Sequence, residues 1–235
     1  MYRSWENIMA RRKNYKRRRT ILSNTFHLIR ENGMDSVSFQ MIAEKSGISK
    51  SLLQSYYPHK SNLIADVVRN ILNTLDKQVQ KFSVNKEDEV CARTKAFIYA
   101  IEMLGIYDEG LKRIITEVFK SNESLDFWSK TINDWLKEKQ LFDHFDFDPK
   151  EVRMGIAFAV TGVSRLYYDN KEYEVSPEEI ADYGTKAFMY SFLHSSKPTI
   201  EKALKEGHEI IESTDIKTIH HAIDTMFDED KEIVC

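Results

Sequence analysis

Apolar residues recur at intervals of three and four along most of the chain, which is the spacing of one face of a helix. Between residues 15 and 32 these positions are Leu22, Phe26 and Ile29. A longer stripe predicts a helix over about 61–82, and its members are Leu63, Val67, Ile71, Leu75 and Val79. No segment shows a convincing alternation of apolar and polar residues, so the pattern predicts an all-α protein.

Capping residues divide the chain into further helices. Ser38 can cap a short helix, and a second helix begins near Ser49 and is broken by Pro58. Ser176 and Glu179 have the spacing of a capping box, which marks a helix start. The remaining helices are predicted over about 86–104, 108–119 and 122–140, from Asp148-Pro149, from Ser176-Pro177, and over 199–212 and 215–228.

Composition agrees with long helices, because only 4 prolines and 8 glycines occur among 235 residues. No apolar run reaches the roughly 18 residues that a membrane-spanning helix needs. The N-terminal segment lacks the apolar core of a secretion signal, and two cysteines, Cys91 and Cys235, indicate no disulfide framework. We therefore expect a cytoplasmic protein.

The charge is unevenly distributed. Residues 1–60 hold 12 Lys and Arg against 4 Asp and Glu, a net charge of +8, so the remainder carries −11 of the total of −3. A basic head on an acidic body indicates that the head meets a polyanion, and both nucleic acid and an anionic membrane satisfy this. We interpret residues 1–19 as a basic arm rather than a folded element, with Arg17, Arg18 and Arg19 as phosphate contacts. The alternative is a solvated tail.

The two short helices around Gly47 have the pattern of a helix-turn-helix, in which the second helix projects into the major groove of DNA. Such a motif needs apolar residues on its inner face and polar residues outside. Ala43, Ile48 and Leu53 fit the inside. The outside is formed by Ser49, Lys50, Ser51, Gln54 and Ser55. The amide of Gln54 is suited to pairing with adenine.

The stretch VSFQMIAEKSGISKSLLQSYYPHK, from Val37 to Lys60, resembles the signature of the tetracycline-repressor (TetR) family. The matching positions are Ser38, Ile42-Ala43, Gly47-Ile48-Ser49, Tyr56-Tyr57 and Lys60, with Arg19 to Leu22 and Phe26 in the preceding helix. The resemblance implies a basic arm over 1–14, a three-helix DNA-binding head over 15–60 and a larger helical domain over 61–235 for effector binding and dimerisation. It also implies a repressor that a ligand releases from DNA.

The resemblance places DNA contacts in and around the turn: Ser38, Gln40, Ser49, Lys50, Ser51, Leu52, Gln54, Ser55, Tyr56, His59 and Lys60. Tyr56 and Lys60 would hold phosphates, whereas Tyr57 is expected to pack in the core. The family pattern usually has Gly at the position of Ser51 and Tyr at that of Gln54, so the operator sequence cannot be carried over from the family.

For the larger domain, the resemblance implies a homodimer and a pocket for a small apolar or amphipathic ligand. The candidate dimer contacts are the small residues Gly155, Ala159, Gly162 and Gly184, for which packing within the chain is the alternative. The candidate pocket residues are Phe97, Met103, Tyr107, Phe119, Phe127, Trp128, Trp135 and Phe158. The segment from about 198 to the C-terminus could close this pocket or enlarge the dimer interface.

The sequence offers little support for other functions. We expect no enzyme, because no nucleophile–base pair or phosphate-binding glycine loop is evident, and no cofactor. His220 and His221 are adjacent and point to different faces, so no metal site is expected. Membrane-surface binding is disfavoured because the basic arm has no accompanying apolar face. A regulator controlled by a partner protein, rather than by a ligand, is the main alternative, and it would be favoured by a body without a cavity.

Overall fold

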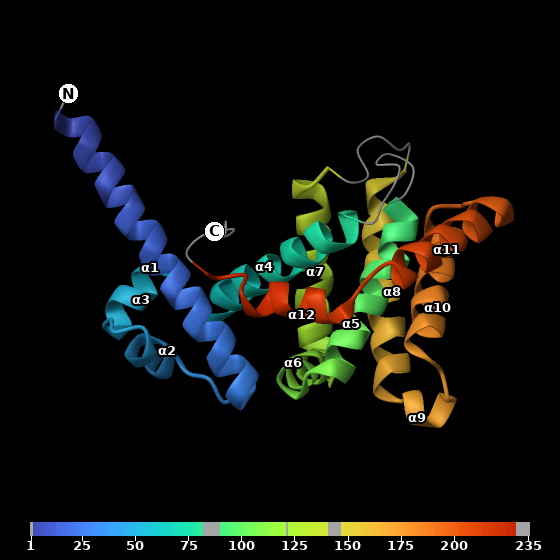
Figure 1. The fold of residues 1–235 in the computed structure, drawn as a ribbon, viewed down its shortest axis with the longest axis horizontal. Coiled ribbons are helices and arrows are strands. Elements are labelled where there is room, and N and C mark those ends of the chain that lie inside the picture. Colours follow the sequence, from blue (N-terminus) through green and yellow to red (C-terminus); the bar gives the residue numbers. More distant parts are fainter. Residues whose placement is uncertain (1, 82–89, 121, 141–146, 229–235) are drawn as a thin grey trace. The chain divides into compact units, whose positions relative to one another are not determined.

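The computed structural model describes residues 2–81, 90–120, 122–140 and 147–228, and over these ranges the elements are all helices (Figure 1). The chain divides into two compact units. We call Met1–Leu72 together with Asp224–Cys235 the head unit, and Asn73–Ile223 the body unit. The prediction of an all-α protein with a smaller N-terminal head is confirmed.

The head unit contains α1 (Tyr2–Asn32), α2 (Phe39–Lys45), α3 (Lys50–Tyr56) and the first part of α4 (Lys60–Gln80). α2 contacts both α1 and α3. The apolar residues that the three- and four-residue spacing selects form the core of this unit. Its fully buried side chains include Ile21, Leu22, Phe26, Ile42, Leu53, Tyr57 and Leu63. The packing of Tyr57 in the core is as predicted.

The structure corrects the N-terminal arm. α1 begins at Tyr2 and continues without interruption to Asn32, so the segment expected to be a separate arm is helical (Figure 1). The physical reason lies in its composition, since residues 2–19 contain neither glycine nor proline and are rich in Arg and Lys, which favour helix. The helix propensity of these residues, summed over the segment, outweighs the repulsion between their positive charges, so the segment is helical.

The body unit contains the rest of α4 and eight further helices within the described residues. They are α5 (Val90–Tyr107), α6 (Glu109–Lys120), α7 (Asn122–Glu138), α8 (Pro149–Tyr168), α9 (Asn170–Tyr173), α10 (Pro177–Phe192), α11 (Lys197–Glu212) and α12 (Ile216–Asp224). α5 contacts α6, α10 and α11, and α8 lies beside α10 (Figure 1). The four-residue α9 was not predicted.

Two helix starts in the body follow the capping signals in the sequence. Asp148 accepts a hydrogen bond from the backbone of Lys150, and proline occupies the first turn of α8. The Ser176 hydroxyl accepts from the backbone N–H of Glu179, whose carboxylate accepts from the backbone N–H of Ser176 at 2.8 Å. The predicted capping box is therefore confirmed.

The C-terminal segment does more than extend the body. α11 packs closely on α5, where a side chain at Gly207 would come within 2.9 Å of the Ala92 carbonyl oxygen. After α12 the chain rejoins the head unit, in which the ring of Phe227 lies 6.0 Å from that of Phe26. Arg30 is paired with Asp224 in the same unit. The head is thus completed by residues that the sequence analysis placed in the domain 61–235.

Candidate nucleic-acid interface and effector cavity

The turn between α2 and α3 is built by local hydrogen bonds. Ser38 caps α2 by accepting from the backbone N–H of Met41 at 3.3 Å, and Ser49 caps α3 by accepting from that of Leu52 at 3.2 Å. Gly47 has φ of +64°, in the left-handed region that favours glycine. This backbone reversal lets Ile48 donate to the Ala43 carbonyl at 3.0 Å, which fixes the crossing of the two helices.

Asn24 of α1 holds the same turn from the other side, and the sequence analysis did not select it. Its amide nitrogen donates to the Lys45 carbonyl at 3.1 Å and to the Ser46 hydroxyl at 3.2 Å. Both acceptors lie at the end of α2, so α1 is connected directly to the helix-turn-helix. The signal that could have found Asn24 is its polarity within the otherwise apolar inner part of α1.

The outer face of α3 is open to solvent. Lys50, Ser51, Gln54 and Ser55 are all exposed, whereas Leu53 on the opposite face is completely buried. The Ser55 hydroxyl donates to the Leu52 carbonyl at 2.7 Å, and Ser49 is occupied as a cap. The Ser51 hydroxyl lies within hydrogen-bond distance of that of Ser49, at 3.4 Å. Lys50, Ser51 and Gln54 are the exposed polar side chains that this face presents to a nucleic acid.

Other predicted contacts surround α3. Tyr56 is half-buried and its hydroxyl accepts from the Arg17 guanidinium at 3.4 Å, so these two side chains lie together at the end of α3. Gln40 is exposed and donates to the Glu44 carboxylate at 2.6 Å, and His59 is exposed. The Lys60 ammonium donates to the Met34 carbonyl.

Arg18 and Arg19, which were expected to contact phosphates, contact other side chains of the head instead. Arg18 lies 3.5 Å from the Asp66 carboxylate and over the ring of Tyr57, 5.4 Å from its centroid. Burial is the main cause that raises the pKa of Asp66, while Arg18 opposes this shift. Arg19 is 9% exposed and lies over the ring of Tyr15. These arginines are used inside the head, which leaves Arg17 as the exposed one of the three.

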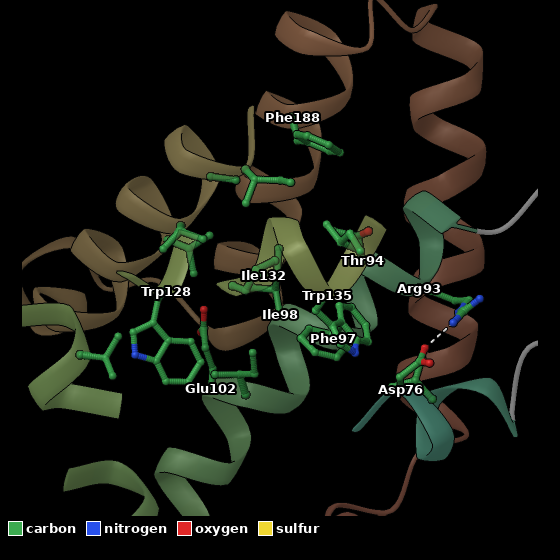
Figure 2. Close-up of a pocket in the computed structure, with 18 of the residues that line it drawn as sticks. Asp76, Arg93, Thr94, Phe97, Ile98, Glu102, Trp128, Ile132, Trp135 and Phe188 are labelled. Carbon is green, nitrogen blue, oxygen red and sulfur yellow. Dashed lines mark hydrogen bonds and ion pairs between the residues drawn. The ribbon is translucent and has the colours of Figure 1, made fainter. Parts of the chain in front are cut away.

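The body unit contains a mainly apolar cavity with a volume of about 170 Å³. A cavity of roughly 150 Å³ is enough for a benzene molecule. The lining comes from α4, α5, α6, α7, α8 and α10 and includes four of the residues predicted from the sequence, namely Phe97, Phe119, Trp128 and Trp135. Figure 2 shows Phe97, Trp128 and Trp135 around the cavity. The Trp135 indole nitrogen donates to the Asn73 side-chain oxygen at 3.0 Å, which fixes the ring in the wall.

The other four predicted pocket residues do not line the cavity. Tyr107 is 46% exposed and its ring contacts that of His220 at 4.9 Å. Phe158 is 56% exposed on α8, and Met103 and Phe127 are half-buried outside the lining. Aromatic composition alone could not separate the two sets, because the face of each helix that turns inward is decided by packing.

The cavity contains charged side chains that were not predicted. Asp76 and Arg93 form an ion pair in its wall. Glu102, which is 1% exposed, presents a carboxyl group whose two oxygens have no hydrogen-bond partner among the described residues (Figure 2). Burial raises the pKa of Glu102 to about 9. Burial, with a smaller contribution from Glu102, raises the pKa of Tyr167 to about 12.

The small residues expected at a dimer interface have different surroundings. A side chain at Gly155 would come within 2.6 Å of the Phe188 ring, and one at Gly184 within 2.6 Å of Val163. Both glycines therefore allow α8 and α10 to approach within the chain. Ala159 lines the cavity, while Gly162 is exposed with no atom near its missing side chain.

In the described ranges, no three His, Cys, Asp or Glu side chains are grouped so that they could hold a metal ion. In the same ranges, no helix is both long enough and apolar enough to span a membrane.

A helix-turn-helix with an exposed polar face, joined to a larger helical unit, defines the class of helical DNA-binding regulators. Residues 21–67, which include most of the head, match the family model described as bacterial regulatory proteins of the tetR family. The head therefore matches the DNA-binding part of the family that its sequence pattern predicted.

Individual relatives agree with this assignment. The nucleoid occlusion factor SlmA of Haemophilus ducreyi is 29% identical over 86 residues, which are 37% of this chain and 42% of that protein. The HTH-type transcriptional regulator BetI of Stenotrophomonas maltophilia is 28% identical over 82 residues, 35% of this chain and 42% of that protein. The match thus spans less than half the length of these relatives.

Beyond the head, the likeness is one of fold. The crystal structure of RolR in complex with resorcinol aligns over 83% of this chain and 95% of its own length, with a TM-score of 0.53 and 13% identity. The all-helical body is therefore a known arrangement.

Proposed function

We propose that the chain is a transcription regulator, acting as a repressor, that binds a near-palindromic operator as a two-fold dimer and is released by a small apolar or amphipathic effector. The observation that carries the proposal is the exposed polar face of α3, with Lys50, Ser51 and Gln54, on a turn held by Asn24 and Gly47. A helix presented in this way fits the major groove of duplex DNA.

Dimerisation is supported by the outer surface of α8, α9 and α10. The exposed large hydrophobic side chains there are Met154, Phe158, Tyr168, Tyr173, Tyr183 and Tyr190. Phe158 and the exposed Gly162 lie four apart on α8, and Tyr183 and Tyr190 lie seven apart on α10, so each pair shares one helix face. A second copy covering these faces would remove apolar area from water and set two heads about 34 Å apart, the spacing of successive major grooves.

The cavity supports control by a small ligand. Its lining is mainly aromatic and aliphatic, and it occurs in the unit that does not carry the helix-turn-helix. A ligand that binds one conformation of the body more tightly than another would shift the population of DNA-binding dimers. Control by a partner protein is the alternative, and the presence of a cavity of this size favours the ligand over it.

The DNA-binding proposal is tested by fluorescence anisotropy with the duplex upstream of the protein's own gene, at several salt concentrations. We expect tight binding whose logarithm falls with the logarithm of salt by roughly 0.9 per phosphate contact. Gln54→Ala should reduce affinity mainly for operators with adenine at one position. If Gln54→Ala weakened binding equally on all operator variants, base reading by Gln54 would be excluded. Binding whose affinity does not depend on salt concentration would exclude the DNA-binding proposal.

The dimer is tested by sedimentation velocity. Replacing Tyr183 and Tyr190 together by Glu should convert a dimer into a monomer. The matched control is Ile106→Glu, which changes a side chain that is 58% exposed on α5, away from the proposed interface. A native protein that sediments as a monomer, or a control that dissociates equally, would contradict the two-fold arrangement.

A further inference from the structure

Glu102 is unusual among the carboxylates of the body unit, because it is buried in an apolar cavity without a partner. It is 1% exposed, and neither carboxyl oxygen has a hydrogen-bond partner among the described residues. Burying a polar group without a hydrogen-bond partner destabilises a folded protein, so such groups call for an explanation. A stability role does not explain Glu102, because a leucine would fill this position at lower cost.

Helical spacing places Glu102 on the face of α5 that lines the cavity. Thr94, Phe97, Ile98 and Ile101 precede it at intervals of eight, five, four and one, and all of them line the same cavity. Figure 2 shows the carboxyl group of Glu102 directed toward the space among the labelled rings, with Trp128 nearby. The carboxyl is thus positioned to meet a bound molecule.

The rest of the lining determines which charge that molecule carries. Among the described residues that line the cavity, Arg93 is the one cationic side chain, and it is paired with Asp76. Thr94 donates its hydroxyl to the Val90 carbonyl at 2.9 Å. An anionic ligand would find no uncommitted cation in this lining and would be repelled by Glu102. Phe97, Phe119, Trp128 and Trp135 present aromatic rings, and the faces of such rings attract cations.

We propose that the cavity binds a lipophilic cation, namely an aromatic or alkyl-substituted amine, whose charged nitrogen lies against the Glu102 carboxylate and whose apolar groups lie among the rings. This inference rests on the proposed function only in treating the cavity as the effector site. The apolar lining alone would fit any small hydrophobic molecule, whereas Glu102 indicates the chemical class of the effector.

The proposal has a proton balance that can be measured. Since burial raises the pKa of Glu102 to about 9, the empty cavity holds a neutral carboxyl group at pH 7. A permanent cation that pairs with the carboxylate must displace this proton, which leaves for the solvent, so one proton is released for each cation bound. At pH values below the pKa of Glu102, the affinity for the cation should then increase roughly tenfold for each unit by which the pH is raised.

The titrating groups around Glu102 are few. Tyr167 of α8 interacts electrostatically with both Glu102 and Glu109 of α6. Asp76 of α4 and Arg93 of α5 form an ion pair and neutralise each other. Desolvation is the cause of the Glu102 shift. The pKa of Tyr167 is raised to about 12, so this hydroxyl stays neutral between pH 6 and 9. Glu102 is therefore the group to which a cation-linked proton release would belong.

The test compares two probes of nearly the same shape, phenyltrimethylammonium and tert-butylbenzene, with the full-length protein. Trp128 and Trp135 line the cavity, so their fluorescence reports occupancy. We expect phenyltrimethylammonium to bind with affinity that rises roughly a hundredfold from pH 6 to 8, and tert-butylbenzene to bind without pH dependence. Calorimetry of the cation in buffers of different ionisation enthalpy should report release of close to one proton at pH 7.

Glu102→Gln provides the matched variant, since it keeps the shape and removes the charge. It should lose at least tenfold in cation affinity at pH 8 and retain tert-butylbenzene binding, which also shows that its cavity is folded. Cation binding that is absent, independent of pH or unchanged in Glu102→Gln overturns the proposal, as does equal binding of both probes at pH 8.

The inference and the proposed function can fail separately. Operator binding is measured in the same samples by anisotropy. If the cation binds with proton release but leaves DNA affinity unchanged, the cation site stands and its role as effector site is wrong. If DNA is released by neutral ligands while the cation does not bind, the regulator stands and the cation site is wrong.

Discussion

The indole nitrogen of Trp135 donates a hydrogen bond to the side-chain oxygen of Asn73 at 3.0 Å, and both residues are buried in the body unit. Trp135 forms part of the cavity wall, where its ring stacks on that of Phe97 at 5.7 Å. A polar side chain on α4 therefore sets the position of an aromatic residue on α7. The shape of the cavity depends on this pairing.

Asn73→Ala should lower the free energy of unfolding by about 1–3 kcal/mol, because it leaves the buried indole N–H without an acceptor. Chemical denaturation followed by circular dichroism measures this change. In a double-mutant cycle, Trp135→Phe should make the Asn73→Ala substitution much less costly, since the donor is then absent. If the two effects are simply additive, the hydrogen bond does not stabilise the body.

Asn24→Ala should weaken the attachment of α1 to the helix-turn-helix. Two hydrogen bonds to the end of α2 are lost, and their loss should cost about 1–2 kcal/mol of stability and reduce operator affinity. Asn32→Ala is the matched control on the same helix, because its amide donates only within α1, to the Leu28 carbonyl. Anisotropy with operator DNA should distinguish the two variants, and equal affinities would refute a role for Asn24 in holding the turn.

Local signals predicted the head well. Ser38 and Ser49 cap the helices expected of them, and Gly47 has the positive φ that the turn requires, because these features depend on residues near in sequence. The burial of Arg19 could not be predicted from such local signals. Its burial depends on packing within the head, and a run of basic residues looks alike whether its members are paired or free.

The cavity shows the same division between local and distant causes. The helical stripe on α5 could have identified Glu102, since it lies four residues after Ile98 on one face. A glutamate in a helix is nevertheless usually solvated, and the burial of Glu102 depends on the packing of other helices around α5, which are distant in sequence. Likewise, Phe158 and Phe97 are both phenylalanines within predicted helices, yet Phe158 is exposed and Phe97 lines the cavity.

Phe227→Ala should destabilise the head although this residue is distant from it in sequence. Its ring is 6% exposed and contacts Phe26, and truncating a buried phenylalanine costs roughly 3–5 kcal/mol. Hydrogen exchange of α1 amides should therefore become faster. Phe227→Leu is the matched control and should cost less than about 1.5 kcal/mol, because most of the volume remains. Unchanged exchange in Phe227→Ala would mean that the C-terminal segment does not support the head.

The pH dependence of stability should carry the signature of Glu102. Its pKa is raised from 4.5 to about 9, so between these values the folded protein keeps a proton that the unfolded chain releases. The stabilising effect is complete below pH 4.5 and decreases as pH rises, by at most about 1.4 kcal/mol per unit for this group. Urea denaturation from pH 5 to 8 should show a flatter decline in Glu102→Gln than in the native protein. Glu123→Gln, at an exposed position of α7, should keep the native slope, and identical slopes in all three proteins would mean that Glu102 is not a buried, protonated carboxyl.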